Sequence, residues 1–127
     1  MKLFVDDIRN APDETWHVAR TAIEAIRAIA RYDFEVISLD HDISHQVHLD
    51  ELSRPFPCAE TFASVAYYIT AKYRPYLNAE KSPQFPRVIL HTSNQVAGDE
   101  MARILEEADI NIEKKYMGAA NRLEMEI

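Results

Sequence analysis

The stretch Val36-Ile37-Ser38-Leu39-Asp40-His41-Asp42 joins four residues of strand character directly to three ionisable side chains. A short apolar run of this kind is typical of a buried strand in a parallel sheet, whose carboxyl end lies at the ligand-binding edge. Two other runs have the same form. Leu3 to Val5 is followed by Asp6-Asp7-Ile8-Arg9, and Val88 to Leu90 is followed by His91-Thr92-Ser93-Asn94. These three runs predict neighbouring strands whose polar ends meet in space.

The segments around these runs alternate between strand and helix patterns. Thr21-Ala22-Ile23-Glu24 has the form of a capping box, in which a hydroxyl and a carboxylate satisfy free N–H groups at a helix start. Strands alternating with helices predict an α/β fold with three layers and a mostly parallel five-stranded sheet. This order of elements resembles a flavodoxin-like, receiver-type domain. We expect a single domain over residues 1–127 with a variable loop at about 44–57. The remaining expected elements are strands at Trp16 to Ala19 and around Ile110 and Ile112, helices at Thr21 to about Tyr32, Cys58 to about Lys72 and about Val96 to Ala108, and a short helix or tail at Ala119 to Ile127.

The composition excludes several classes of protein. The chain has 127 residues, of which 47% are hydrophobic and 28% charged, which is typical of a soluble globular domain. No apolar run approaches the roughly 20 residues of a membrane span, and the charged Lys2, Asp6 and Asp7 argue against a signal peptide. Cys58 is the single cysteine, so no internal disulfide forms and we expect a reducing, cytoplasmic location.

Charge and glycine content restrict the ligands. The net charge of -7 excludes non-specific binding to duplex nucleic acid, which needs clustered Lys and Arg. With only two glycines, Gly98 and Gly118, the chain has no glycine-rich phosphate loop or dinucleotide fingerprint. A local pocket for one phosphate remains compatible with this composition.

The carboxylates at the strand ends indicate a cation. Asp6, Asp7 and Asp40 would repel one another if they met at one point, unless one is protonated or a cation joins them. Such hard oxygen ligands suit Mg²⁺ or Mn²⁺, which often share a substrate phosphate. The alternative is structural: Asp6 and Asp7 cap a loop, and Asp40 or Asp42 forms an Asx-turn. We favour the metal or phosphate site because three such clusters occur together.

Two histidines follow different strands of the predicted sheet. His41 and His91 have side chains that titrate near neutral pH, so one can activate water while the other protonates the leaving oxygen of a cyclic phosphate. Either histidine can also ligate a transition metal. The structural alternative for each is a buried ring bonded to a backbone carbonyl. We favour acid–base catalysis by His41 and His91, with Asp40 alongside them.

Further polar residues at the same strand ends suit phosphate binding. Arg9 presents a planar fork for a phosphate or for Asp42. Ser93 and Asn94 precede a predicted helix, where they serve as an N-cap or as a phosphate seat. Thr92 is either part of this pocket or an ordinary strand residue. Weaker candidates, for which structural roles are favoured, are His45 and His48 as metal ligands, Cys58 as a thiolate, Trp16, Tyr67 and Tyr68 as stacking rings, and Lys114 and Lys115 as pocket lysines.

These motifs resemble the cyclic-phosphate-processing receiver family, a divergent group related to response-regulator receivers. The resemblance rests on the segments 3–9, 16–25, 37–43 and 89–94 and covers roughly residues 3 to 108. It implies a receiver-like sheet and metal-associated carboxylates at Asp6, Asp7 and Asp40. It also implies that His41, Asp42, His91 and Asn94 surround a pocket for cyclic phosphates on nucleotides or RNA ends, with RNA-repair proteins as possible partners. The segment Ile43-Ser44-His45-Gln46 lacks the glycines of the family pattern, which bears on substrate choice.

We therefore expect a metal-assisted phosphoesterase that uses Mg²⁺ or Mn²⁺. A first alternative is a non-enzymatic phosphorylation switch in which Asp40 accepts the phosphoryl group. Ordinary receivers have acidic residues, a Thr or Ser, and a Lys at the ends of successive strands, and this chain has such residues at the corresponding strand ends. His41 and His91 have no role in such a switch, which favours the enzyme. A second alternative is a module that binds phosphorylated ligands without turning them over.

Overall fold

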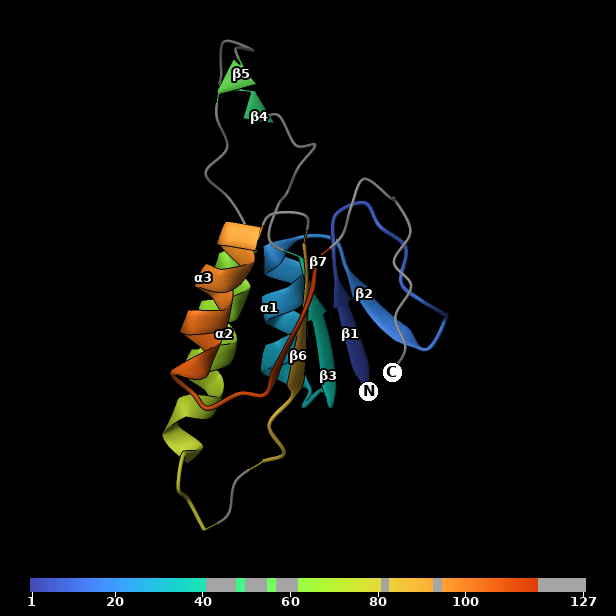
Figure 1. Cartoon of the computed structure of the whole chain (residues 1–127). Helices are drawn as coiled ribbons and strands as arrows, with labels where there is room; N and C mark the ends of the chain where they lie inside the picture. The colour runs from blue at the N-terminus through green and yellow to red at the C-terminus, as the bar shows by residue number, and fades with distance from the viewer. Residues whose placement is uncertain (41–47, 50–54, 57–61, 81–82, 93–94, 117–127) are drawn as a thin grey trace.

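A five-stranded, all-parallel sheet forms the centre of the molecule, with strand order β2-β1-β3-β6-β7 (Figure 1). The computed structural model describes residues 1–40, 48–49, 55–56, 62–80, 83–92 and 95–116. The sheet strands are β1 (Lys2–Val5), β2 (Trp16–Ala19), β3 (Val36–Leu39), β6 (Arg87–Thr92) and β7 (Ile112–Tyr116). The other elements are α1 (Ala22–Arg31), the antiparallel pair β4 (His48–Leu49) and β5 (Pro55–Phe56), α2 (Ala63–Tyr73), the short 3-10 helix η1 (Arg74–Tyr76) and α3 (Gln95–Glu106).

The receiver-like α/β fold predicted from the sequence is confirmed, and β2 and β3 have the predicted bounds. One half of the predicted capping box forms, because the Thr21 hydroxyl accepts a hydrogen bond of 3.1 Å from the Glu24 backbone N–H at the start of α1. The Glu24 carboxylate accepts from the backbone N–H of Arg20, one residue before the cap, at 3.5 Å. The main difference is in β6. This strand continues through His91 and Thr92, which we expected to follow it, because both residues still pair with β7.

Smaller differences concern element ends. Helix α3 ends at Glu106, so Ala108 packs in the core from the turn after it, and Ile110 precedes β7. Helix α2 begins at Ala63, and the earlier part of its predicted span, 58–61, lies outside the described residues. The predicted tail at 119–127 and most of the loop at 44–57 also lie outside them.

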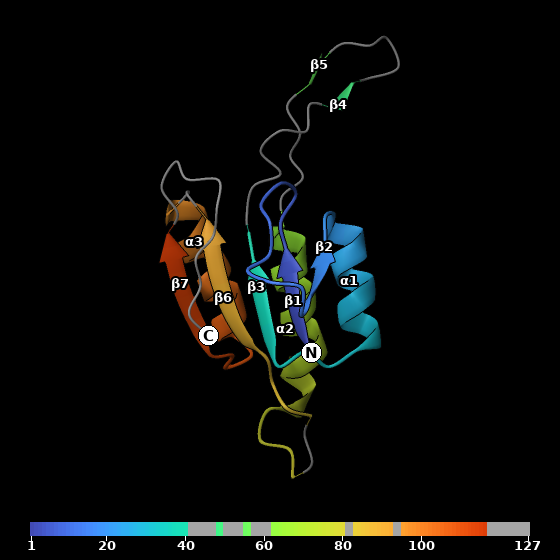
Figure 2. The same cartoon turned by 90° about the vertical axis from the view of Figure 1, so that its right-hand side faces the viewer.

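All three α-helices in the described part of the chain lie on the same face of the sheet (Figures 1 and 2). The connections from β2 to β3, from β3 to β6 and from β6 to β7 all run in the same direction across the strand order. Because parallel crossovers are right-handed, connections that run in one direction place their helices on one face. We expected helix layers on both faces, and the described helices form a single layer.

The connection from β1 to β2 runs in the opposite direction and contains no helix. Residues 6–15 therefore pass over the face that the helices leave uncovered, and Ala11 packs there against the buried side chains. Side chains alternate along each strand, so the sheet has two different cores. The helix-covered core includes Leu3, Val5, Ile37, Leu39, Val88 and Leu90, and the opposite core consists of Phe4, Trp16, Val36 and Ile89.

Candidate functional site

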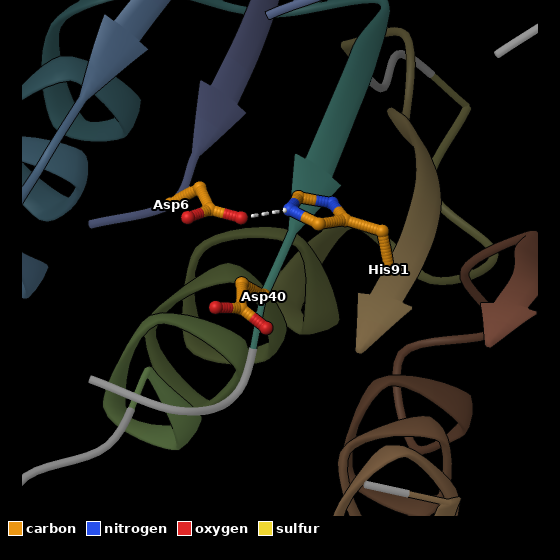
Figure 3. Close-up of side chains that lie close together, drawn as sticks. All are labelled: Asp6, Asp40 and His91. Carbon is orange, nitrogen blue, oxygen red and sulfur yellow. Dashed lines mark hydrogen bonds and ion pairs between the residues drawn. The ribbon is translucent and has the colours of Figure 1, made fainter. Parts of the chain in front are cut away.

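Three buried side chains converge on the face opposite the helices, at the carboxyl ends of the central strands. In the strand register, Phe4 lies beside Ser38 and Ser38 beside Ile89. Two residues further along each strand, the same row contains Asp6, Asp40 and His91. All three are buried, with at most 3% of the residue exposed. Figure 3 shows the Asp6 carboxylate, just after β1, directed at the imidazole of His91 in β6, with Asp40, just after β3, beside this pair.

The Asp6 carboxylate is the most heavily hydrogen-bonded member of this group. Its Oδ1 accepts hydrogen bonds from the backbone N–H groups of Ile8, at 2.9 Å, and Arg9, at 2.8 Å. Its Oδ2 lies 2.9 Å from Nε2 of His91. Burial alone would raise the pKa of Asp6, but these hydrogen bonds outweigh it and hold the pKa well below its usual range. Asp6 is therefore an anion that the fold stabilises before any ligand binds.

His91 is enclosed on all sides. Its Nδ1 contacts the hydroxyl of Ser38 at 2.5 Å, and its ring stacks on Phe4 with a centroid distance of 4.8 Å and an interplanar angle of 7°. Burial lowers the pKa of His91, and although Asp6 opposes this effect, the net shift is downward. A neutral ring that donates its Nε2 proton to ionised Asp6 leaves Nδ1 to accept from Ser38. The fold thereby selects one tautomer of His91.

Arg9 supplies the positive charge of the site. Its Nη1 lies 3.3 Å from Oδ2 of Asp6 and 3.6 Å from Oδ1 of Asp40. A second arginine, Arg20 just after β2, holds the turn in place because its Nη1 donates to the carbonyls of Asp6, at 3.1 Å, and Arg9, at 2.6 Å. With His91 neutral, the two carboxylates and Arg9 sum to one negative charge in a buried position.

The residues of this group fit a divalent cation. One atom each of Asp6, Asp40 and His91 lies within 4.8 Å of the other two, and the two carboxylate oxygens are the available ligands because the ring nitrogens of His91 already bond to Asp6 and Ser38. In an octahedral Mg²⁺ site with bonds of about 2.1 Å, opposite ligand atoms lie about 4.2 Å apart. A small closing movement would therefore bring the two carboxylates onto such an ion. Carboxylate oxygens are the ligands that Mg²⁺ and Mn²⁺ prefer.

The other predicted site residues lie in different environments. Asp7 is half-buried and is not a member of the converging group. Thr92 is buried and, by alternation along β6, belongs to the helix-covered side of the sheet. Lys114 forms an ion pair of 2.8 Å with Asp99, whereas Lys115 lies beside His91 in the register. His41, Asp42, His45, Cys58, Ser93 and Asn94 lie outside the described residues.

The aromatic candidates have the structural roles that we favoured in two of three cases. Trp16 is buried and packs edge-on against Phe4, and Tyr68 packs partly buried against the helix-covered core. Tyr67 is instead an exposed residue of α2, with 63% of its surface accessible.

Sequence reasoning did not identify Ser38 and Arg20 as parts of the site. Ser38 was visible as the one polar residue inside an otherwise apolar strand, because a buried hydroxyl needs a partner. Arg20 was visible as a charged residue directly after β2, in the position that Asp6 and Asp40 have after their own strands. Both signals are weak without knowledge of the strand order. That order brings Ser38 to His91 and Arg20 to the turn after β1.

The comparisons with known proteins agree with this geometry. A family model described as the cyclic-phosphate processing receiver domain matches residues 1–107. Since this match spans most of the 127 residues, the chain belongs to that family. No curated protein and no solved structure gives a match. None of the helices in the described ranges combines the length and apolar character needed to cross a membrane.

Proposed function

We propose that this member of the cyclic-phosphate processing receiver family is a metal-assisted phosphoesterase that opens a cyclic phosphate on a nucleotide or RNA end. The observation that carries the proposal is the buried group of Asp6, Asp40 and His91 at the carboxyl edge of the parallel strands. Ligands of open α/β sheets bind at this edge. Buried carboxylates held ready for a cation there suit a phosphate substrate, in agreement with the family's description.

In this proposal Asp6 and Asp40 hold a Mg²⁺ or Mn²⁺ ion, with Asp7 as the adjacent candidate ligand. The ion, when bound, neutralises charge on the phosphoryl group. Arg9 then binds a non-bridging phosphate oxygen through its planar fork. Ser93 and Asn94, which lie between β6 and α3 in the sequence, together with Asp42 complete the proposed substrate contacts. Thr92 is left out of this set because it belongs to the helix-covered side of the sheet.

Hydrolysis requires two proton transfers. A water oxygen bonds to phosphorus and gives up a proton, while one of the two ribose P–O bonds breaks and the released oxygen takes up a proton. We assign direct proton transfer to His41, which follows Asp40 in the chain. His91 was expected to share this task, but its complete burial and its contact with Asp6 favour an indirect role, in which it orients and polarises the Asp6 carboxylate.

Phosphorus NMR of the protein with a 2′,3′-cyclic nucleotide tests the reaction. We expect conversion to a phosphomonoester with Mn²⁺ or Mg²⁺ and none with a chelator. Asp40→Asn should lose at least about a hundredfold in rate, since it removes a metal ligand. Asp99→Asn, which removes an exposed carboxylate on α3, should retain the rate. An unchanged cyclic phosphate with folded, metal-supplied protein, or equal turnover with chelator, would overturn the proposal.

The same samples separate the phosphorylation switch from the enzyme. Incubation with a small phosphodonor should label Asp40 if the chain is a switch, and the label should be absent from Asp40→Asn. Because the enzyme proposal gives Asp40 to the metal, it predicts monoester product without a stable phosphoprotein. Saturable binding of the cyclic nucleotide with neither label nor product would identify a binding module.

A further inference from the structure

A single nitrogen of Arg9 lies between the two buried carboxylates. The 3.3 Å contact to Asp6 and the 3.6 Å contact to Asp40 are both made by Nη1. The Arg9 side chain is itself 12% exposed. One nitrogen of the guanidinium cation that contacts one oxygen of each carboxylate has the arrangement of a bridging cation. In the structure, Arg9 therefore takes the place that a divalent ion would need between Asp6 and Asp40.

The backbone of Arg9 is fixed independently of its side chain. The N–H of Arg9 donates to Oδ1 of Asp6, and its carbonyl accepts from Arg20. Both of these contacts persist if the guanidinium moves, because neither involves it. The long side chain of arginine has several rotatable bonds and can leave the carboxylates while the turn stays in place. The turn therefore fixes the backbone of Arg9 beside the carboxylates, and the charged side chain can still move.

Charge prevents Arg9 and a divalent ion from sharing this position. With Arg9 in place and His91 neutral, the group of Asp6, Asp40 and Arg9 carries one negative charge. A divalent ion on the two carboxylates would lie next to the guanidinium in a buried environment, where like charges repel strongly. If the guanidinium leaves, the ion and the two carboxylates sum to zero. The guanidinium of Arg9 is then available to bind an anion that enters the site.

We propose that Arg9 and a divalent metal ion occupy the Asp6–Asp40 pair alternately, so that metal binding releases Arg9 to bind the phosphate. This inference rests on the proposed function only in that it assumes a metal ion at Asp6 and Asp40. It adds an order of binding. Before the metal binds, Arg9 occupies the position between the two carboxylates. The affinity for phosphate rises once the metal is present. Without a metal ion, Arg9 offsets the repulsion between the two buried carboxylates.

Mn²⁺ titration calorimetry without nucleotide tests the exchange. Arg9→Met keeps the approximate length of the side chain and removes the charge. If Arg9 covers the carboxylates in about nine of ten wild-type molecules, the variant should bind Mn²⁺ about tenfold more tightly than the wild type. Arg103→Met is the matched control, because it makes the same charge change in the last turn of α3 on an exposed side chain. It should bind Mn²⁺ as the wild type does. Adding Asp40→Asn to Arg9→Met should abolish the gain.

A second measurement uses the unmodified protein, in case Arg9→Met does not fold. The arginine Nε–Hε signals of ¹⁵N-labelled protein should show one resonance, that of Arg9, shifting on addition of Mg²⁺ while the signal of Arg20 stays in place. Equal or weaker Mn²⁺ binding by folded Arg9→Met would overturn the inference. So would the absence of Mn²⁺ binding in both proteins, or an Arg9 signal that ignores bound Mg²⁺. Metal binding with the predicted exchange but without hydrolysis would refute the phosphoesterase and leave the exchange standing.

Discussion

The two faces of the central sheet are built from the same strands but have different side chains and different roles. Alternate residues of β1, β3 and β6 point to the helices on one side and to the β1–β2 connection on the other. The helix-covered side is aliphatic along these strands up to Thr92, the last residue of β6. The opposite side carries the row of Phe4, Ser38 and Ile89 and ends in the buried charged row of Asp6, Asp40 and His91.

This difference shows how a small domain accommodates buried charge. Ionised groups are costly to bury unless they are paired and hydrogen-bonded. Here the aliphatic face and the strand pairing fix the backbone, so the opposite face can hold ionised side chains in position. Arg9, His91 and two backbone N–H groups then compensate the Asp6 carboxylate. One face stabilises the fold and the other holds the buried ionisable groups.

The largest effect is expected on the helix-covered face. Leu39→Ala removes a fully buried side chain, which costs about 2–5 kcal/mol in free energy of unfolding because part of the cavity stays open. Urea unfolding followed by circular dichroism measures it. Ile23→Ala, on the exposed side of α1, should change stability by less than about 0.5 kcal/mol. Equal losses in the two variants would show that this face is not the stabilising one.

A smaller loss is expected one residue earlier, on the opposite face. Ser38→Ala leaves Nδ1 of buried His91 without its hydroxyl partner, and the free energy of unfolding should fall by about 1–3 kcal/mol. Ser38→Cys retains a weak donor of similar size and should lose less. Thermal and urea unfolding of the three proteins decide this. If the alanine variant is as stable as the wild type, the contact between Ser38 and His91 has no stabilising role.

The charged row should make stability depend on pH in a way that the aliphatic face does not. Burial lowers the pKa of His91, so below the ordinary value of about 6.5 the unfolded chain binds a proton that folded His91 does not. Wild-type stability therefore falls as pH drops below that value. His91→Gln should show a shallower fall, by up to about 1.4 kcal/mol per pH unit.

The pH comparison uses urea unfolding from pH 7.5 to pH 5 in the presence of a chelator. His17→Gln, which alters an exposed histidine, is the control and should follow the wild type. Parallel curves for wild type and His91→Gln would contradict a buried, neutral His91. Asp6 does not interfere in this range, because its lowered pKa means that its contribution is lost only at pH below about 4.

The smallest effect is expected outside both faces, at the start of α1. Thr21→Ala removes the hydroxyl that accepts from the Glu24 N–H, at a cost of about 1 kcal/mol in free energy of unfolding. Thr21→Ser should restore most of this loss, as measured by the same urea titration. Mn²⁺ affinity should be unaffected by both changes. A larger loss than that of Ser38→Ala would reverse the ranking of cap and charged row.

Most of the fold was predictable from the sequence, because its signals are local. Apolar runs located the strands, and the Thr21–Glu24 pattern located a helix start. The strand-end rule also predicted that the clusters containing Asp6, Asp40 and His91 would meet, but it grouped Asp7 with the converging carboxylates. Register and strand order are not local properties. Two features depend on which strands are neighbours: the pairing with β7 that keeps His91 inside β6, and the placement of the described helices in one layer.

The contact between Ser38 and His91 illustrates the same limit. These residues are 53 positions apart, and nothing near either of them specifies the other. Their meeting requires that β3 and β6 lie side by side with a fixed register. The position of Arg20 beside the turn after β1 similarly requires that β1 and β2 pair in parallel across a short connection.

The outer strand β7 has a consequence for the behaviour of the protein at high concentration. It forms one edge of the sheet, and three of its five residues, Glu113, Lys114 and Lys115, are charged. An exposed strand edge invites pairing with a strand of another molecule, which is a route to aggregates and fibrils. Consecutive charges oppose such pairing, because an incoming strand would have to accommodate them along its length. The sequence of β7 thus terminates the sheet and disfavours its growth from one molecule into the next.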